Sequence, residues 1–130
     1  MKKQILIIED DPRWQKIFVA LAQGSDRELL SATTLSDALT ILKKTSLDLV
    51  ITDINLEFGV PGNIDGEHFI RHLEASAPII PVIIVSGTIP EDALNLPRDR
   101  TVRFLRKQKF SRQEFIQAVD QGLNFRYSAL

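Results

Sequence analysis

Short apolar runs alternate along the chain with longer stretches in which apolar residues recur every three or four positions. The runs are rich in Ile, Val and Leu and are typical of strands buried on both faces, whereas the longer stretches have the period of amphipathic helices. The predicted strands are residues 4–9, 28–32, 47–53, 82–85 and 102–106. This alternation predicts an α/β fold, in which a mostly parallel sheet carries helices on both faces.

Two of the predicted helices begin at residues that commonly cap helices. Asp11 stands directly before Pro12, which favours a helix that begins there and ends near Gly24. Ser36 is expected to open a second helix. That helix is expected to end at Lys44, because a positive charge there favours the negative end of the helix dipole.

Three further helical segments follow along the chain. The third helix is expected over residues 67–75, after a long loop that contains glycine and proline. Prolines bracket residues 91–96 and leave room only for a shortened fourth helix. The last helix has the clearest start, because Ser111 and Glu114 are spaced as in a capping box.

The connections between the strands restrict how the sheet can be wound. Right-handed crossovers favour a doubly wound, flavodoxin-like sheet of five parallel strands in the order 2-1-3-4-5. In that order the first and third strands are neighbours, so Glu9 and Asp10 should meet Asp53 at the carboxyl edge of the sheet. Three carboxylates that repel one another stay ionised only if a cation compensates them, and oxygen ligands suit Mg²⁺.

The ends of the last two strands carry groups that complement an anion. Ser86 offers a hydroxyl and Gly87 an unobstructed backbone N–H after the fourth strand, and Lys107 offers a positive charge after the fifth. These donors match the oxygens of a phosphoryl group. The sequence therefore predicts a site that handles phosphoryl groups.

Five segments in this order resemble the receiver domain of two-component response regulators. They are ILIIEDDP at 5–12, LVITDINL at 49–56, DG at 65–66, PVIIVSG at 81–87 and FLRK at 104–107. One such string is a weak signal, but five on the expected strands and loops are a strong one. The resemblance covers nearly the whole chain, so residues 1–130 are interpreted as a single receiver domain.

The resemblance implies a phosphoacceptor function. Asp53 would take a phosphoryl group from the phosphohistidine of a sensor histidine kinase or a histidine phosphotransfer protein. Asp10, Asp53 and the carbonyl of Asn55 would bind Mg²⁺ directly, and Glu9 would hold it through water. The chain would catalyse at most its own phosphorylation and dephosphorylation, and it would act on an output domain or a downstream protein.

The resemblance also assigns the remaining strand ends. Ser86, Gly87 and Lys107 would bind the oxygens of the phosphoryl group. Phe104 would be the aromatic switch that moves inward when the site is phosphorylated. That movement would change the surface around the fifth strand and the last helix.

Three features depart from the pattern of the family. Gln108 replaces the usual proline after Lys107, so a trans peptide is expected there, and Lys109 could compete for the role of the lysine. The loop over residues 56–64 is roughly five residues longer than usual, and long loops beside a site often carry function. The helix over residues 91–96 is short. Gln108 and the long loop support an alternative, a receiver-like binding or scaffold module without productive phosphotransfer.

Composition narrows the classes of function further. The 130 residues suit one domain, and a net charge of −1 gives no general attraction for nucleic acid or a membrane surface. The absence of cysteine excludes disulfides and thiolate metal sites, and no apolar stretch is as long as a membrane span. His68 and His72 lie one helical turn apart without a third ligand and are interpreted as ordinary helix residues. We expect a cytoplasmic protein without direct contacts to nucleic acid or membrane.

Overall fold

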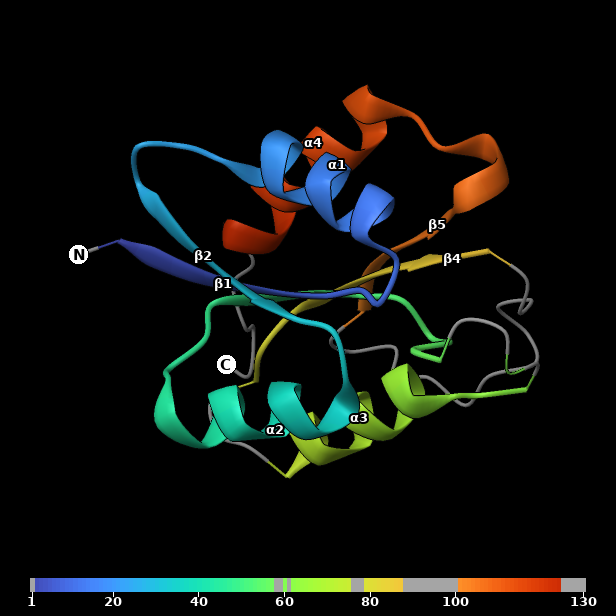
Figure 1. Cartoon of the computed structure of the whole chain (residues 1–130). Helices are drawn as coiled ribbons and strands as arrows, with labels where there is room; N and C mark the ends of the chain where they lie inside the picture. Colours follow the sequence, from blue (N-terminus) through green and yellow to red (C-terminus); the bar gives the residue numbers. More distant parts are fainter. Residues whose placement is uncertain (1, 58–59, 61, 76–78, 88–100, 125–130) are drawn as a thin grey trace.

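A central sheet of five parallel strands organises the molecule (Figure 1). The computed structural model describes residues 2–57, 60, 62–75, 79–87 and 101–124. The strands are β1 (Lys3–Ile8), β2 (Arg27–Ala32), β3 (Leu49–Thr52), β4 (Val82–Ser86) and β5 (Thr101–Arg106). Their order is β2-β1-β3-β4-β5, so the predicted doubly wound α/β sheet and its strand order are confirmed.

Helices cover both faces of the sheet in the part of the chain that the structure describes. Figure 1 shows helices above the sheet and helices below it. The upper pair is α1 (Pro12–Ala22) and α4 (Arg112–Leu123), and the lower pair is α2 (Leu35–Lys44) and α3 (Asp65–Glu74). A short 3₁₀ helix, η2 (Lys107–Lys109), joins β5 to α4. None of these described helices is both long and apolar enough to cross a membrane.

The two apolar cores follow from the alternation of side chains along each strand. Ile5 and Ile7 of β1 belong to a core with α1 and α4, and Leu6 and Ile8 belong to a core with α2 and α3. All four side chains are completely buried. Because burial of one such side chain contributes about 1.5–3 kcal/mol, both faces of β1 help to fix the register of the sheet.

Of the two predicted helix caps at the starts of α1 and α2, the first is confirmed and the second was wrong. The side chain of Asp11 accepts a hydrogen bond from the N–H of Arg13, as expected for the cap of α1. The prediction that Ser36 opens α2 was wrong, because Thr34 is the cap and its hydroxyl accepts the N–H of Asp37 at 3.1 Å. The helix therefore begins at Leu35, with Ser36 already inside its first turn.

Helix α3 begins at Asp65, two residues earlier than the predicted Glu67. The residue at the cap position, Ile64, has no side chain that could cap the helix. Asn63 does this work instead, because its Oδ1 accepts the N–H groups of both Asp65 and Leu56 at 3.0 Å. One amide oxygen thus starts α3 and closes the base of the long loop.

Helix α4 begins where the capping box predicted. The hydroxyl of Ser111 accepts the N–H of Glu114 at 3.2 Å. The carboxylate of Glu114 pairs with Arg103 of β5 at 3.3 Å, so this side chain also ties the helix to the sheet. The shortened fourth helix that was predicted over residues 91–96 lies outside the described residues.

Candidate functional site

Backbone pairing brings the acidic residues together at one edge of the sheet. Ile8 of β1 is aligned with Thr52 of β3, and the N–H of Asp53 continues this pairing by donating to the carbonyl of Ile8 at 3.1 Å. Glu9, Asp10 and Asp53 each offer a carboxylate oxygen, and these oxygens lie within 4.8 Å of one another. The predicted convergence of the three carboxylates is therefore present, and we call these residues the acidic cluster.

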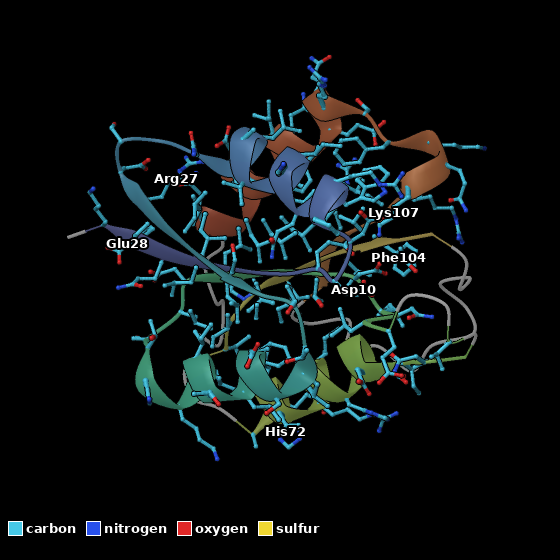
Figure 2. The ribbon with its side chains drawn as sticks, in the orientation of Figure 1. Asp10, Arg27, Glu28, His72, Phe104 and Lys107 are labelled. Atoms are coloured by element: carbon cyan, nitrogen blue, oxygen red, sulfur yellow. The ribbon has the colours of Figure 1, made fainter. Side chains whose placement is uncertain are left out.

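The acidic cluster lies at the end of the sheet where the strands finish. Figure 2 shows Asp10, Phe104 and Lys107 at this end, and Arg27 and Glu28 at the opposite end. This is the edge at which open α/β sheets bind ligands.

His68 and His72 take no part in the acidic cluster. Both are exposed on α3, as expected for ordinary helix residues. Figure 2 shows His72 on the lower helix layer, away from Asp10 and Lys107.

Lys107, the first residue of η2 after β5, reaches into the acidic cluster. Its Nζ lies 2.7 Å from Glu9 Oε1 and 2.7 Å from Asp53 Oδ2, and its side chain is only 14% exposed. Lys109 is exposed, so Lys107 is the lysine that serves this site. Three carboxylates and one ammonium leave a formal charge of about −2 if all are ionised, which favours a divalent cation.

Burial and charge shift the pKa values of the three groups that touch. Burial raises the pKa of Glu9 to about 7, although its bond to Lys107 opposes the shift. Burial also raises the pKa of Asp53, against the bond from Lys107 and the bond that Oδ1 accepts from the N–H of Ile54 at 2.6 Å. Burial by itself lowers the pKa of Lys107, but the two carboxylates outweigh it and raise that pKa.

The raised pKa of Glu9 predicts that the protein loses stability as the pH rises. The folded pKa of about 7 lies above the ordinary glutamate pKa of 4.5, so the folded state binds the proton more tightly. The stabilisation from Glu9 is complete below pH 4.5 and is lost as the pH rises through about 7. With a chelator present, urea titrations should show the free energy of unfolding falling by on the order of 3 kcal/mol over this range.

Two substitutions test whether Glu9 causes this pH dependence, measured as the slope of the free energy of unfolding against pH. Glu9→Gln should flatten it, because the amide does not titrate in this range. Glu28→Gln removes an exposed glutamate at the other end of the sheet and should leave the slope as in the wild type. An unchanged slope in Glu9→Gln would show that another group controls the pH dependence.

The donor set of the acidic cluster fits Mg²⁺. All three side chains provide oxygen, the ligand that this ion prefers. Glu9 Oε1 is buried and, among the described residues, no hydrogen bond of acceptable geometry reaches it, although the Lys107 ammonium is close. A buried carboxylate oxygen in this situation is suited to a cation.

Asn55 can contribute to such a site only through its backbone. Its side-chain Nδ2 donates to the carbonyl of Val60 at 3.0 Å, and its Oδ1 accepts the N–H of Glu57 at 2.9 Å. Both ends of the amide are thus used to hold the long loop. The role of the Asn55 carbonyl as a metal ligand stays a prediction.

Ser86 and Gly87 lie beside the base of Lys107. Ser86 is buried at the end of β4 and is aligned with Arg106, the residue before Lys107. The side chain of Gln108 donates a hydrogen bond to the carbonyl of Gly87. Gln108 was recognised in the sequence only as a departure from the family, and its bond ties the end of β4 to the start of η2.

Phe104 lies on β5 and packs against the core formed with α2 and α3. Its side chain is half-buried, and the guanidinium carbon of Arg106 lies 5.4 Å from the centre of its ring. Its place on the sheet fits the expected switch, and its movement stays a prediction.

Two residues contribute to the site in ways that the sequence did not indicate. Gly66, which the sequence indicated only as part of the DG string at 65–66, packs against the strand end that carries Asp53. Its N–H donates to the carbonyl of Ile54 at 2.8 Å, and a Cβ on Gly66 would lie 1.9 Å from the Asp53 carbonyl oxygen. Trp14 packs against the core formed with α1 and α4, and its ring also lies near the Lys107 ammonium. The close packing of Gly66 and the contact between Trp14 and Lys107 both depend on segments far apart in the chain, so no local sequence pattern indicates them.

Comparisons with known proteins agree with this geometry. The family model described as the response regulator receiver domain matches residues 5–120. The transcriptional regulatory protein GlrR of Escherichia coli strain K12 is 26% identical over 121 residues, which cover 92% of this chain and 26% of GlrR. The chain therefore spans about a quarter of the length of that relative.

Solved structures show the same fold. A response regulator receiver domain protein from Clostridium thermocellum superposes with a TM-score of 0.75 at 26% identity and covers 94% of both chains. The signal receiver domain of an HD domain-containing protein from Pseudomonas fluorescens Pf-5 gives a TM-score of 0.79 at 21% identity, with 95% of this chain and 96% of the other covered.

Proposed function

The chain belongs to the response regulator receiver domain family, and from this premise we propose that Asp53 accepts a phosphoryl group in a signalling reaction. The observation that carries the proposal is the placement of Asp53 between two further carboxylates and the Lys107 ammonium, at the ligand-binding edge of the sheet. We further propose that residues 1–130 form a single receiver domain.

The proposed reaction is a transfer to the carboxylate of Asp53. A carboxylate oxygen attacks phosphorus in line, the P–N bond of a phosphohistidine breaks, and the imidazole leaves with the bonding electrons. The product is an acyl phosphate on Asp53. The pair with Lys107 favours the ionised form of Asp53, so no separate base is needed to create the nucleophile.

Charge compensation is the main task of the groups around Asp53. Glu9, Asp10, Asp53 and the Asn55 carbonyl would hold Mg²⁺, which would neutralise the negative charge of the phosphoryl group. Lys107 would move from the Asp53 carboxylate to the oxygens of the transferred group. Ser86 and Gly87, which end β4 on the same side, would donate the remaining hydrogen bonds.

The proposed partners follow from this chemistry. The donor would be a sensor histidine kinase or a histidine phosphotransfer protein. GlrR is named as a transcriptional regulatory protein and is about four times longer than the matched segment, which supports an output domain or a downstream protein as the receiver of the signal. Direct binding to nucleic acid or membrane is not part of the proposal, and a cytoplasmic location stays a prediction.

The proposed switch connects the site to the surface of β5. Phe104 precedes Lys107 by three residues on the same strand end, so a movement of Lys107 toward a phosphoryl group can be transmitted along β5. The ring is half-buried and lies against Arg106, and an inward movement would exchange this contact for a deeper position. We propose that this exchange alters the surface that partners recognise.

Asp53→Asn tests the proposal directly. The wild type, incubated with Mg²⁺ and acetyl phosphate, should gain the mass of one phosphoryl group, and the variant should gain none because an amide is not a nucleophile here. Intact-mass spectrometry measures both. Asp11→Asn is the matched control, because it changes an aspartate beside the cluster whose capping role asparagine can keep.

Beryllofluoride separates the receiver from the scaffold alternative. In the wild type it should produce Mg²⁺-dependent NMR shifts at Asp53 and at Phe104. A folded wild-type protein that shows neither a mass gain nor such shifts would support a scaffold module without phosphotransfer.

A further inference from the structure

Trp14 provides a neighbour for Lys107 in addition to the two carboxylates. The Lys107 Nζ lies 5.2 Å from the centre of the Trp14 ring, within the range of a cation–π contact. Trp14 is on the first turn of α1, and Lys107 follows β5, so elements from opposite ends of the chain meet here. Figure 2 shows Lys107 at the same end of the sheet as Asp10, which leads into α1.

An aromatic cluster holds both the ring and the segment that carries the lysine. The Trp14 ring meets Phe110 edge to face at 5.1 Å and Phe18 at 5.6 Å. Phe110 directly follows η2, and its N–H donates to the carbonyl of Lys107 at 3.3 Å. Phe115 of α4 stacks on Phe18 at 5.2 Å and completes the support.

A contact with an aromatic ring such as that of Trp14 suits a lysine that has to move. In the proposed reaction Asp53 Oδ2 loses its negative charge or gains phosphorus, so Lys107 must exchange this partner for phosphoryl oxygens. A hydrogen bond would hold the ammonium in one place, whereas an aromatic face attracts a cation over a broad area. The long stem of lysine otherwise allows many rotamers, most of which point to solvent.

We propose that Trp14 is a positioning residue that keeps the Lys107 ammonium over Glu9 and Asp53. This inference rests on the proposed function for its role in phosphotransfer, but the positioning itself is a property of the unphosphorylated protein. A leucine at position 14 would keep an apolar, although smaller, side chain and would lack the electron-rich face.

NMR of the Lys107 ammonium tests the positioning without any phosphoryl donor. In Trp14→Leu the solvent exchange of the ammonium protons should be faster on the order of fivefold, because the cation–π attraction is lost. Trp14→Phe keeps an aromatic face and should restore most of the protection. Equal exchange in the wild type and in a folded Trp14→Leu would overturn the proposal.

A double-mutant cycle tests the role in the reaction. Trp14→Leu should slow phosphorylation by acetyl phosphate on the order of fivefold in the wild-type background and should have no effect when Lys107 is already methionine. Equal slowing in both backgrounds would show a merely structural role and would overturn the proposal. If the wild type gains no phosphoryl group at all, the proposed function fails, and the exchange measurement still decides whether Trp14 positions Lys107.

Discussion

Replacing Gly66 by alanine should destabilise the protein by about 3 kcal/mol, because the added methyl group overlaps the backbone of Asp53 and Ile54. Its Cβ would lie 1.9 Å from the carbonyl oxygen of Asp53 and 2.7 Å from the Cα of Ile54. Neither atom can rotate away as the end of a side chain can. The chain after β3 or the start of α3 must therefore shift, and urea denaturation should show a lower midpoint.

Two other glycines provide graded controls for this prediction. A Cβ on Gly87 would meet Lys107 Cδ at 3.7 Å, an ordinary contact, so Gly87→Ala should change stability by no more than about 0.5 kcal/mol. A Cβ on Gly122 would lie 2.6 Å from Leu49 Cδ1, which can move, and alanine gains up to about 1 kcal/mol in a helix interior. A loss in Gly66→Ala no larger than in these two variants would contradict the close packing described for Gly66.

The displacement in Gly66→Ala should also reach the chemistry. Gly66 holds the strand end through its bond to the Ile54 carbonyl, and the N–H of Ile54 in turn donates to Asp53 Oδ1. We therefore expect the folded fraction of Gly66→Ala to be phosphorylated more slowly than the folded wild type. The rate measured on folded protein then reports an effect on the reaction that is separate from the loss of stability.

Lys107→Met should cost about 3 kcal/mol of stability above pH 7 in the presence of a chelator. The substitution keeps a long apolar stem but leaves the buried carboxylates of Glu9 and Asp53 beside each other without their shared cation. Removing one partner from a buried ion pair typically costs about 3–5 kcal/mol. Thermal or urea unfolding of both proteins over a range of pH measures this difference.

The pH dependence of this deficit has a definite sign. The raised pKa of Lys107 means that its stabilisation is complete below 10.5 and is lost only above its folded value. On the acid side, Glu9 becomes protonated and no longer needs a cation, so the deficit of Lys107→Met should begin to shrink as the pH falls through about 7. Burial also raises the pKa of Asp53, so its protonation at lower pH should reduce the deficit further. Adding Mg²⁺ should also reduce it, because the ion would bind the same carboxylates.

Lys109→Met is the matched control for Lys107→Met. It removes the same charge two residues later, at an exposed position, and should change stability by no more than about 0.5 kcal/mol. Equal losses in the two variants would mean that the ion pairs of Lys107 contribute nothing specific.

The sheet and the acidic cluster could be predicted because they depend on local patterns. Buried parallel strands require continuous apolar runs, and the charges that follow them have to gather at one edge. Glu9, Asp53 and Lys107 were therefore found from their positions after strands alone.

Other features depend on choices that local patterns do not decide. Thr34 and Ser36 are both residue types that cap helices well, so residue preference alone does not decide that Thr34 caps α2. The capping amide of Asn63 acts across a loop, where spacing gives no signal. Trp14 has the apolar character of a core residue, so its contact with Lys107 became evident only when the two ends of the chain were placed together.

The position of Trp14 makes the protein its own optical probe. It is the only tryptophan in the chain, so the near-ultraviolet emission of the protein comes mainly from one indole. A positive charge 5.2 Å from the centre of that indole ring perturbs its excited state, so a displacement of the charge should change the emission maximum and the quantum yield. The rate at which the Lys107 side chain moves relative to Trp14 can thus be followed in unlabelled protein by stopped-flow fluorescence.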